Sequence, residues 1–226
     1  MDSTPIIVIS SSKPQAGKTT LALNLAAALW SDLFKVKLFA PDNPEVDEFL
    51  RQRNLLRQTG CALPLPELIA RSELSAYAGD KKEVIIADIP TVDNEKYADV
   101  FAAAHTLITV GTSGEDLQWS FEHPYMQLIW QTKKSVAARG VKYLNWIALL
   151  NKVENDDALK EMTDCQRRFG YRLAEPLHYR ESFRYVRNGY CAADMACFRN
   201  VFKMSMPDVY ARREILTLTD FLWQGK

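Results

Sequence analysis

Cysteine pairs with the spacing of a metal site are missing from this sequence of 226 residues. The four cysteines form no CxxC motif and have no nearby histidine arrangement suited to zinc; they are Cys61, Cys165, Cys191 and Cys197. We interpret them as free thiols in a reducing compartment. The lack of a suitable pair also disfavours an iron–sulfur protein.

Long apolar runs and an excess of charge of one sign are lacking as well. No segment approaches the roughly 18 apolar residues of a membrane-spanning helix, and Asp2 stands where a secretion signal would be basic. Basic and acidic residues both number 28, so any contact with nucleic acid or membrane must come from a local patch. We expect a cytoplasmic protein that folds over residues 1–226 as one domain.

Short β-branched segments alternate with longer helical ones, which is typical of repeated strand–helix–strand units. The sequence therefore predicts a single-domain α/β fold with a mostly parallel sheet flanked by helices on both faces. The expected strands are 5–11, 35–40, 83–89, 106–111 and 143–151. The expected helices are 17–29, 44–58, 65–77, 94–103, 115–138, 156–168 and 208–223.

A phosphate-binding loop follows the first expected strand, where Ser12 to Thr20 read SKPQAGKTT. The order of strand, loop and helix is that of a P-loop, whose backbone N–H groups face phosphate oxygens. Lys18 would supply positive charge to the β- and γ-phosphates, and Thr19 a hydroxyl to Mg²⁺. The residues expected to bind the nucleotide are Gln15, Ala16, Gly17, Lys18, Thr19 and Thr20. The first glycine of the strict pattern is replaced by Ser12, so the alternative is a turn at Gly17 followed by a solvated lysine.

Lys13 stands five positions before Lys18, and the loop thereby resembles the deviant Walker A motif of the ParA/MinD ATPases. The resemblance covers most of the chain and implies a P-loop NTPase fold that uses ATP and Mg²⁺. It also implies an ATP-dependent homodimer in which Lys13 reaches the partner's phosphates; the alternative is a surface lysine. Pro14 and Gln15 replace the paired glycines of the family, which makes dimerisation less secure than nucleotide binding.

Two acids follow expected strands. Asp88 ends the apolar run 84–87 and resembles a Walker B acid, which holds Mg²⁺ together with Thr19. Asp42 falls at the family position of the acid that orients the attacking water, while Ala40 replaces an earlier acid of that segment. The expected catalytic residues are thus Lys13, Lys18 and Asp42. Both acids also suit ordinary turns, which is the alternative for each.

The last third contains candidate base and DNA contacts. Asn151 resembles the asparagine that the family presents to the purine, although it also suits a turn. Residues 179–189 resemble a segment that forms a short helix near the nucleotide. Together with Arg167, Arg168 and Arg172, this segment concentrates positive charge with interleaved aromatic residues. The candidates for DNA phosphate contacts are Arg167, Arg168, Arg184 and Arg187. Solvated arginines, or contacts from residues 184 and 187 to the nucleotide, are the alternatives.

The resemblance implies a short ParA-like ATPase that segregates or positions DNA and is therefore associated with the nucleoid. Its expected partners are non-specific DNA and a centromere-binding or cargo adaptor protein. Membrane binding by the last helix, 208–223, is less expected than its packing on the domain. Three alternatives stay open: a positioning ATPase for a protein assembly or the division site, a metabolic enzyme of the dethiobiotin-synthetase type, and a binding module without activity. The metabolic enzyme would not need Lys13.

Overall fold

The computed structural model describes residues 4–31, 34–61, 63–74, 82–92, 94–122, 124–141, 143–154, 162, 166–194 and 205–224. Its strands are β1 (Ile6–Ser10), β2 (Lys35–Phe39), β3 (Glu67–Leu68), β4 (Glu83–Asp88), β5 (Thr106–Gly111), β6 (Asn145–Val153), β7 (Arg172–Leu173) and β8 (Leu177–His178). They pair in the order β3-β2-β4-β1-β5-β6-β7, with β8 also on β6, and every described pair is parallel. The expected α/β fold is confirmed.

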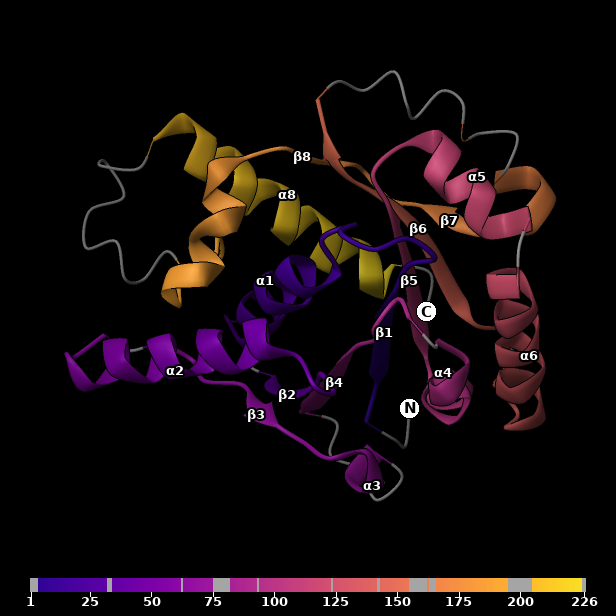
Figure 1. The fold of residues 1–226 in the computed structure, drawn as a ribbon, viewed down its shortest axis with the longest axis horizontal. Helices are drawn as coiled ribbons and strands as arrows, with labels where there is room; N and C mark the ends of the chain where they lie inside the picture. The colour runs from indigo at the N-terminus through magenta and orange to yellow at the C-terminus, as the bar shows by residue number, and fades with distance from the viewer. Residues whose placement is uncertain are drawn as a thin grey trace.

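Helices cover both faces of this sheet (Figure 1). One face carries α1 (Lys18–Ser31), α2 (Pro44–Gln58), α8 (Met206–Trp223) and the 3₁₀ helix η2 (Glu181–Asn188). The other carries α3 (Arg71–Leu74), α4 (Ala98–Ala103), α5 (Gly114–Glu122) and α6 (Pro124–Ala138), with the 3₁₀ helix η1 (Asn94–Tyr97) ahead of α4. Strand residues alternate between the two cores: Ile7 and Ile9 pack under α1, whereas Ile6 and Val8 pack under α4 to α6.

The helix α8 packs against the domain, as the sequence predicts. Its apolar residues Ile215, Leu218 and Leu222 are buried in the same core as α1. None of the described helices has the length and apolar content that crossing a bilayer requires.

The C-terminal third is tied to α2 by a buried ion pair. The guanidinium of Arg53, on α2, donates from Nη1 and Nη2 to the two carboxylate oxygens of Asp194, at 2.6 and 2.7 Å. It also donates to the carbonyl of Gly189, directly after η2, at 3.0 Å. Because both charges are buried and hydrogen-bonded to each other, they hold α2 and η2 in one fixed relation.

Two expected helices need correction. The helix at 115–138 is two helices, α5 and α6, and α6 begins at Pro124, since proline lacks the N–H that a continuous helix uses and suits a first turn. The expected helix at 65–77 is wrong: 67–68 form the edge strand β3, only 71–74 are helical, and 75–77 lie outside the described residues. Most of 156–168 also lies outside them, with 166–169 helical.

The expected strands correspond to β1, β2, β4, β5 and β6, with ends shifted by a residue or two. The two-residue strands β3, β7 and β8 were not predicted. Cys61 and Cys191 are free thiols, as expected, whereas Cys165 and Cys197 lie outside the described residues.

Candidate nucleotide site

A cleft of about 990 Å³ lies at the carboxyl ends of the central strands, where ligands bind in open α/β sheets. The cleft is lined by the loop before α1, the start of α2, and η2 with the residues around it. Figure 1 shows α1 and α2 on the same side of the sheet. The lining residues from the loop are Gln15, Gly17, Lys18, Thr19 and Thr20, and those from η2 and the residues around it are Lys152, Tyr179, Arg184, Val186 and Arg187. Ala16, also in the loop, is buried.

The helix α1 begins at Lys18, so its N-terminal N–H groups face the cleft. Lys18 Nζ donates to Thr91 Oγ1 at 2.6 Å. Thr19 Oγ1 donates to Asp88 Oδ2 at 2.6 Å, and Asn43 Nδ2 donates to the same carboxylate oxygen at 3.0 Å. The structure thus brings the two expected metal residues, Thr19 and Asp88, into contact and adds Asn43 to them.

The carboxylate of Asp88 is poised for a cation. Burial raises its pKa, although hydrogen bonds from Thr19 and Asn43 and the charge of Lys18 act in the opposite direction. Its second oxygen, Oδ1, is buried without a hydrogen-bond partner among the described residues. A buried carboxylate oxygen beside a threonine hydroxyl is the donor set that Mg²⁺ with phosphate uses.

Lys18 is half-buried beside that acid. Burial lowers its pKa, and the negative charge of Asp88 raises it. Its ammonium is hydrogen-bonded to a neutral hydroxyl, so exchanging that bond for a phosphate oxygen would gain a charge pair. These residues fit a magnesium-bound nucleoside triphosphate.

Asn151 contacts the loop. Its Nδ2 donates to the Ala16 carbonyl at 2.8 Å, and its Oδ1 accepts from the backbone N–H of Lys152 at 3.0 Å. The side chain of the next residue also contacts the loop: Lys152 Nζ donates to the Gln15 carbonyl at 2.7 Å. The contact of Asn151 with a purine stays a prediction, while its contact with the phosphate loop is observed.

Lys13 is paired within its own chain. Its ammonium forms an ion pair with Asp116 on α5, and the same carboxylate accepts from the hydroxyl of Thr112. Burial raises the pKa of Asp116, but the hydrogen bonds from Lys13 and Thr112 outweigh it and the pKa is lowered. The sequence analysis missed Asp116. The available signal was an acid soon after the strand that pairs with β1.

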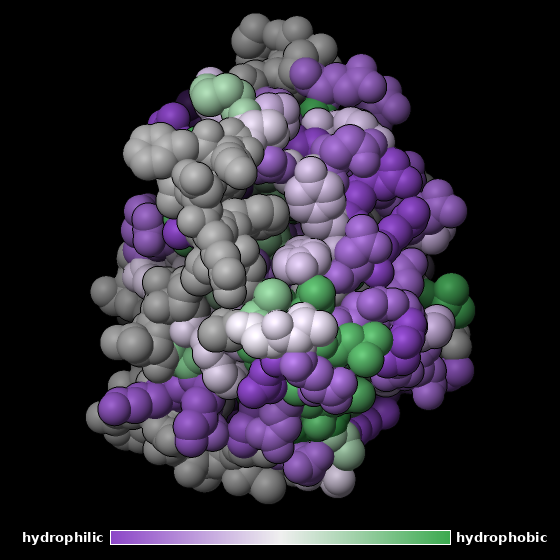
Figure 2. Space-filling view, turned by 90° about the vertical axis from the view of Figure 1, so that its left-hand side faces the viewer, coloured by the Kyte–Doolittle hydropathy of each residue, from purple (hydrophilic) through white to green (hydrophobic). Residues whose placement is uncertain are grey.

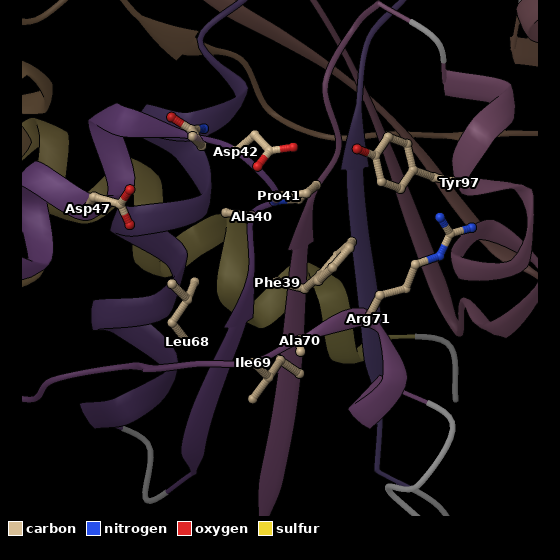
Figure 3. Close-up of a pocket in the computed structure, with 11 residues that line it drawn as sticks. Phe39, Ala40, Pro41, Asp42, Asp47, Leu68, Ile69, Ala70, Arg71 and Tyr97 are labelled. Atoms are coloured by element: carbon tan, nitrogen blue, oxygen red, sulfur yellow. The ribbon is translucent and has the colours of Figure 1, made fainter.

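Asp42 follows the end of β2 and does not line the loop cleft. It lines a second pocket of about 420 Å³ with Phe39, Asp47, Leu68, Arg71 and Tyr97. Figure 3 shows its carboxylate pointing across this pocket towards Tyr97. The backbone of Asp42 has a φ of 50°, a left-handed conformation that a non-glycine residue adopts at some cost. The adjacent Asn43 turns back to Thr19, so the segment touches both pockets.

The four candidate DNA-binding arginines do not form one cluster. Arg184 and Arg187 lie on η2 and line the loop cleft. Arg167 and Arg168 are exposed in the turn of helix before β7, at the far end of the sheet (Figure 1). Figure 2 shows the side of the molecule on the left of Figure 1, where hydrophilic residues cover most of the described surface.

The geometry agrees with a comparison to protein families. A family model described as ATPase MipZ matches residues 67–223, which is more than half of the chain. The chain belongs to the MipZ family of ATPases. The matched part begins after the phosphate loop, so the loop geometry and the family match are separate findings that agree. Among proteins with curated annotation, none matches this MipZ-family chain.

Solved structures with the same fold include those of cell division and plasmid partition proteins. MinD in the MinC:MinD cell division complex of Aquifex aeolicus has 15% identity and a TM-score of 0.58, with 99% of this chain and 97% of that chain covered. A putative plasmid partition protein of Borrelia burgdorferi bound to AMPPNP has 14% identity and a TM-score of 0.56, with 96% and 99% covered. Apo McdA of Cyanothece has 13% identity and a TM-score of 0.53, with 94% and 99% covered. At these identities the likeness shows the fold, which this MipZ-family chain shares with them.

Proposed function

We propose that this chain is an ATP- and Mg²⁺-dependent switch that positions DNA or another large cargo. One observation carries the nucleotide chemistry: Lys18, Thr19 and Asp88 meet at the start of α1, and one buried oxygen of Asp88 has no partner among the described residues. A magnesium ion bound there would neutralise charge that develops on the phosphates during transfer.

The other roles in nucleotide binding and hydrolysis fall to residues in and beside the phosphate loop. Lys18 exchanges its hydrogen bond with Thr91 for one to the β- and γ-phosphates. Asn43 holds Asp88 and Thr19 in register from the start of α2. Asp42, one residue earlier, would orient the attacking water. Its carboxylate points into the neighbouring pocket (Figure 3), so this role requires the segment around Asp42 to turn towards the cleft.

The switch is a homodimer that forms with ATP. Lys13 would leave Asp116 and contact the phosphates bound by the partner, as the resemblance to ParA/MinD ATPases implies. Its side chain is 42% exposed, so it reaches solvent without any movement of the core. Hydrolysis then removes the γ-phosphate that holds the two lysines across the interface, and the monomers separate.

We also propose what the cargo is. The similar structures include a cell division protein and a putative plasmid partition protein. We favour DNA, bound without sequence preference through Arg167 and Arg168, with an adaptor protein that stimulates hydrolysis. A protein assembly or the division site is the alternative cargo.

Sedimentation of the protein alone, with ADP and with AMPPNP tests the switch. We expect monomers in the first two states and dimers with AMPPNP. Lys13→Ala should bind the analogue and stay monomeric, while Lys134→Ala, which removes an exposed lysine on α6, should dimerise as the wild type does. A wild type that binds AMPPNP but stays monomeric at high concentration would contradict the dimer, and the substitutions at Pro14 and Gln15 would then be its cause.

A further inference from the structure

The turn that ends β6 holds two consecutive carbonyl groups of the phosphate loop. Asn151 Nδ2 binds the carbonyl of Ala16 at 2.8 Å, and Lys152 Nζ binds that of Gln15 at 2.7 Å. We propose that Lys152, with Asn151, is a positioning residue that clamps the phosphate loop in the shape that receives a nucleotide. The proposal deepens the proposed function and rests on it for the identity of the ligand.

The geometry of the peptide group explains what the two bonds do. In a planar trans peptide the C=O and the following N–H point in opposite directions. Bonds that draw the carbonyls of Gln15 and Ala16 towards β6 therefore turn the N–H groups of Ala16 and Gly17 away from it. Because the loop lines the cleft at Gln15 and Gly17, this orientation would leave the N–H groups available to phosphate oxygens.

The same contact joins two residues with unusual backbone conformations. Gln15 has a φ of 59° and Lys152 a φ of 61°. In the described part of the chain only one other non-glycine residue, Asp42, has a positive φ. Such conformations persist where surrounding contacts hold them, and they gather at ligand sites. The hydrogen bond from Lys152 Nζ to Gln15 is a contact of that kind for both residues.

The turn also packs directly on the loop. A Cβ atom at Gly17 would lie 2.4 Å from Asn151 Nδ2 and 3.2 Å from Lys152 Cε. Glycine is thus needed at position 17 both for its φ of 84° and for the close approach of this turn. Because the Lys152 side chain is exposed, its removal leaves no cavity in the core, and its effect should be local.

The test replaces Lys152 by methionine, which keeps the length of the side chain and removes the donor. Lys134→Met, at an exposed lysine of α6, is the matched control, and Lys152→Arg restores a cationic donor. Amide hydrogen exchange of residues 13–18, measured without nucleotide, should be faster in Lys152→Met than in the wild type and the control. The affinity for Mg²⁺·AMPPNP should fall by about three- to tenfold, with KM for ATP raised and kcat nearly unchanged.

Gln15→Gly gives a second, independent measurement. Glycine adopts a positive φ without cost, so a loop with glycine at position 15 needs the clamp less. We expect Lys152→Met to lose less affinity in the Gln15→Gly background than in the wild type, and Lys152→Arg to regain most of it. Equal losses in both backgrounds, or unchanged exchange of residues 13–18 in Lys152→Met, would overturn the clamp.

The exchange measurement separates this proposal from the proposed function. If the wild type fails to bind Mg²⁺·AMPPNP, the proposed function is wrong, but the exchange of the loop still decides whether Lys152 holds it. If the wild type binds the analogue and Lys152→Met binds it equally well, the clamp is wrong and the proposed function stands.

Discussion

The two lysines of the phosphate loop are held in different ways. Lys18 is half-buried and hydrogen-bonded to the neutral Thr91, and burial lowers its pKa. Lys13 is 42% exposed and forms an ion pair with Asp116. Exchanging a neutral partner for phosphate costs little, whereas leaving an acid must be compensated by a new anion. The contrast indicates that the nucleotide site is prepared within one chain, whereas the proposed dimerisation would have to break an existing contact of Lys13.

The largest expected effect is at Lys18. Lys18→Ala should abolish binding of Mg²⁺·ATP because the charge that faces the phosphates is lost, while the fold persists because the side chain is outside the core. Calorimetric titration measures the binding, and thermal unfolding the fold. Undiminished affinity in Lys18→Ala, with Lys134→Ala as the control, would show that the loop is not the nucleotide site.

Next in size is the effect of Asp42 on turnover. Asp42→Ala should keep the affinity for ATP and lose about a hundredfold in hydrolysis, the order of magnitude for a group that handles the attacking water. Phosphate release and oligomer mass, recorded together, should show a longer-lived dimer. If the variant hydrolyses ATP at the wild-type rate, Asp42 serves only the turn before α2.

The contrast between Lys13 and Lys18 can be tested at Asp116, the acid that pairs with Lys13. Asp116→Asn keeps the size of the side chain and removes the charge that retains Lys13, so the AMPPNP-dependent dimer should form at about three- to tenfold lower protein concentration. The double variant Lys13→Ala/Asp116→Asn should not dimerise, because the released lysine is the cause of the gain. Weaker dimerisation in Asp116→Asn would mean that the pair supports the interface.

The charge of Asp88 predicts an effect of pH on the ligand-free protein. Because the pKa of Asp88 is raised in the folded state, its neutral form favours folding, and the charged form destabilises the fold as pH rises from about 4, near the unfolded pKa, through the folded value. Asp88→Asn should therefore melt at a higher temperature than the wild type above that range, and at a similar one below it. The variant should also lose the dependence of nucleotide affinity on Mg²⁺.

The smallest expected effect concerns DNA. Replacing Arg167 and Arg168 by alanine should lower the slope of log affinity against log salt by about two per protomer if each contacts one phosphate. The double variant of Arg184 and Arg187 is the control, since these residues line the nucleotide cleft and should change nucleotide affinity instead. Fluorescence anisotropy at several salt concentrations measures both. Negligible DNA binding with ADP and with AMPPNP alike would favour a protein cargo.

The sequence predicted those parts of the fold and site whose signals are local. The five longer strands are rich in apolar residues, and the order of strand, loop and helix around Gly17 and Lys18 is visible in a short window. Strands β3, β7 and β8 have two residues each, which is too short for any periodic pattern to appear. Pro124 was also a local signal, for the boundary between α5 and α6. The helical pattern on both sides of this proline made the two helices look like one.

Contacts between distant segments could not be predicted from the sequence. Asp116 is 103 residues from Lys13, and Asn151 is 135 residues from Ala16, so no spacing relates them. Both follow from the topology, because β5 pairs with β1 and β6 pairs with β5, which places the ends of these strands beside the loop. The strand order of the sheet, once known, would have indicated the contacts of both Asp116 and Asn151 with the loop.

The ion pair between Arg53 and Asp194 determines where the chain can be divided. A fragment that contains only one of these residues would bury a charge without its counterion, which destabilises a domain by about 3–5 kcal/mol. The matched family segment, 67–223, contains Asp194 but lacks both Arg53 and the central strand β1, so we expect it to fold poorly when expressed alone. If the chain is split so that α2 lies on one piece and the segment after η2 on the other, the fold should form only when the two pieces are mixed.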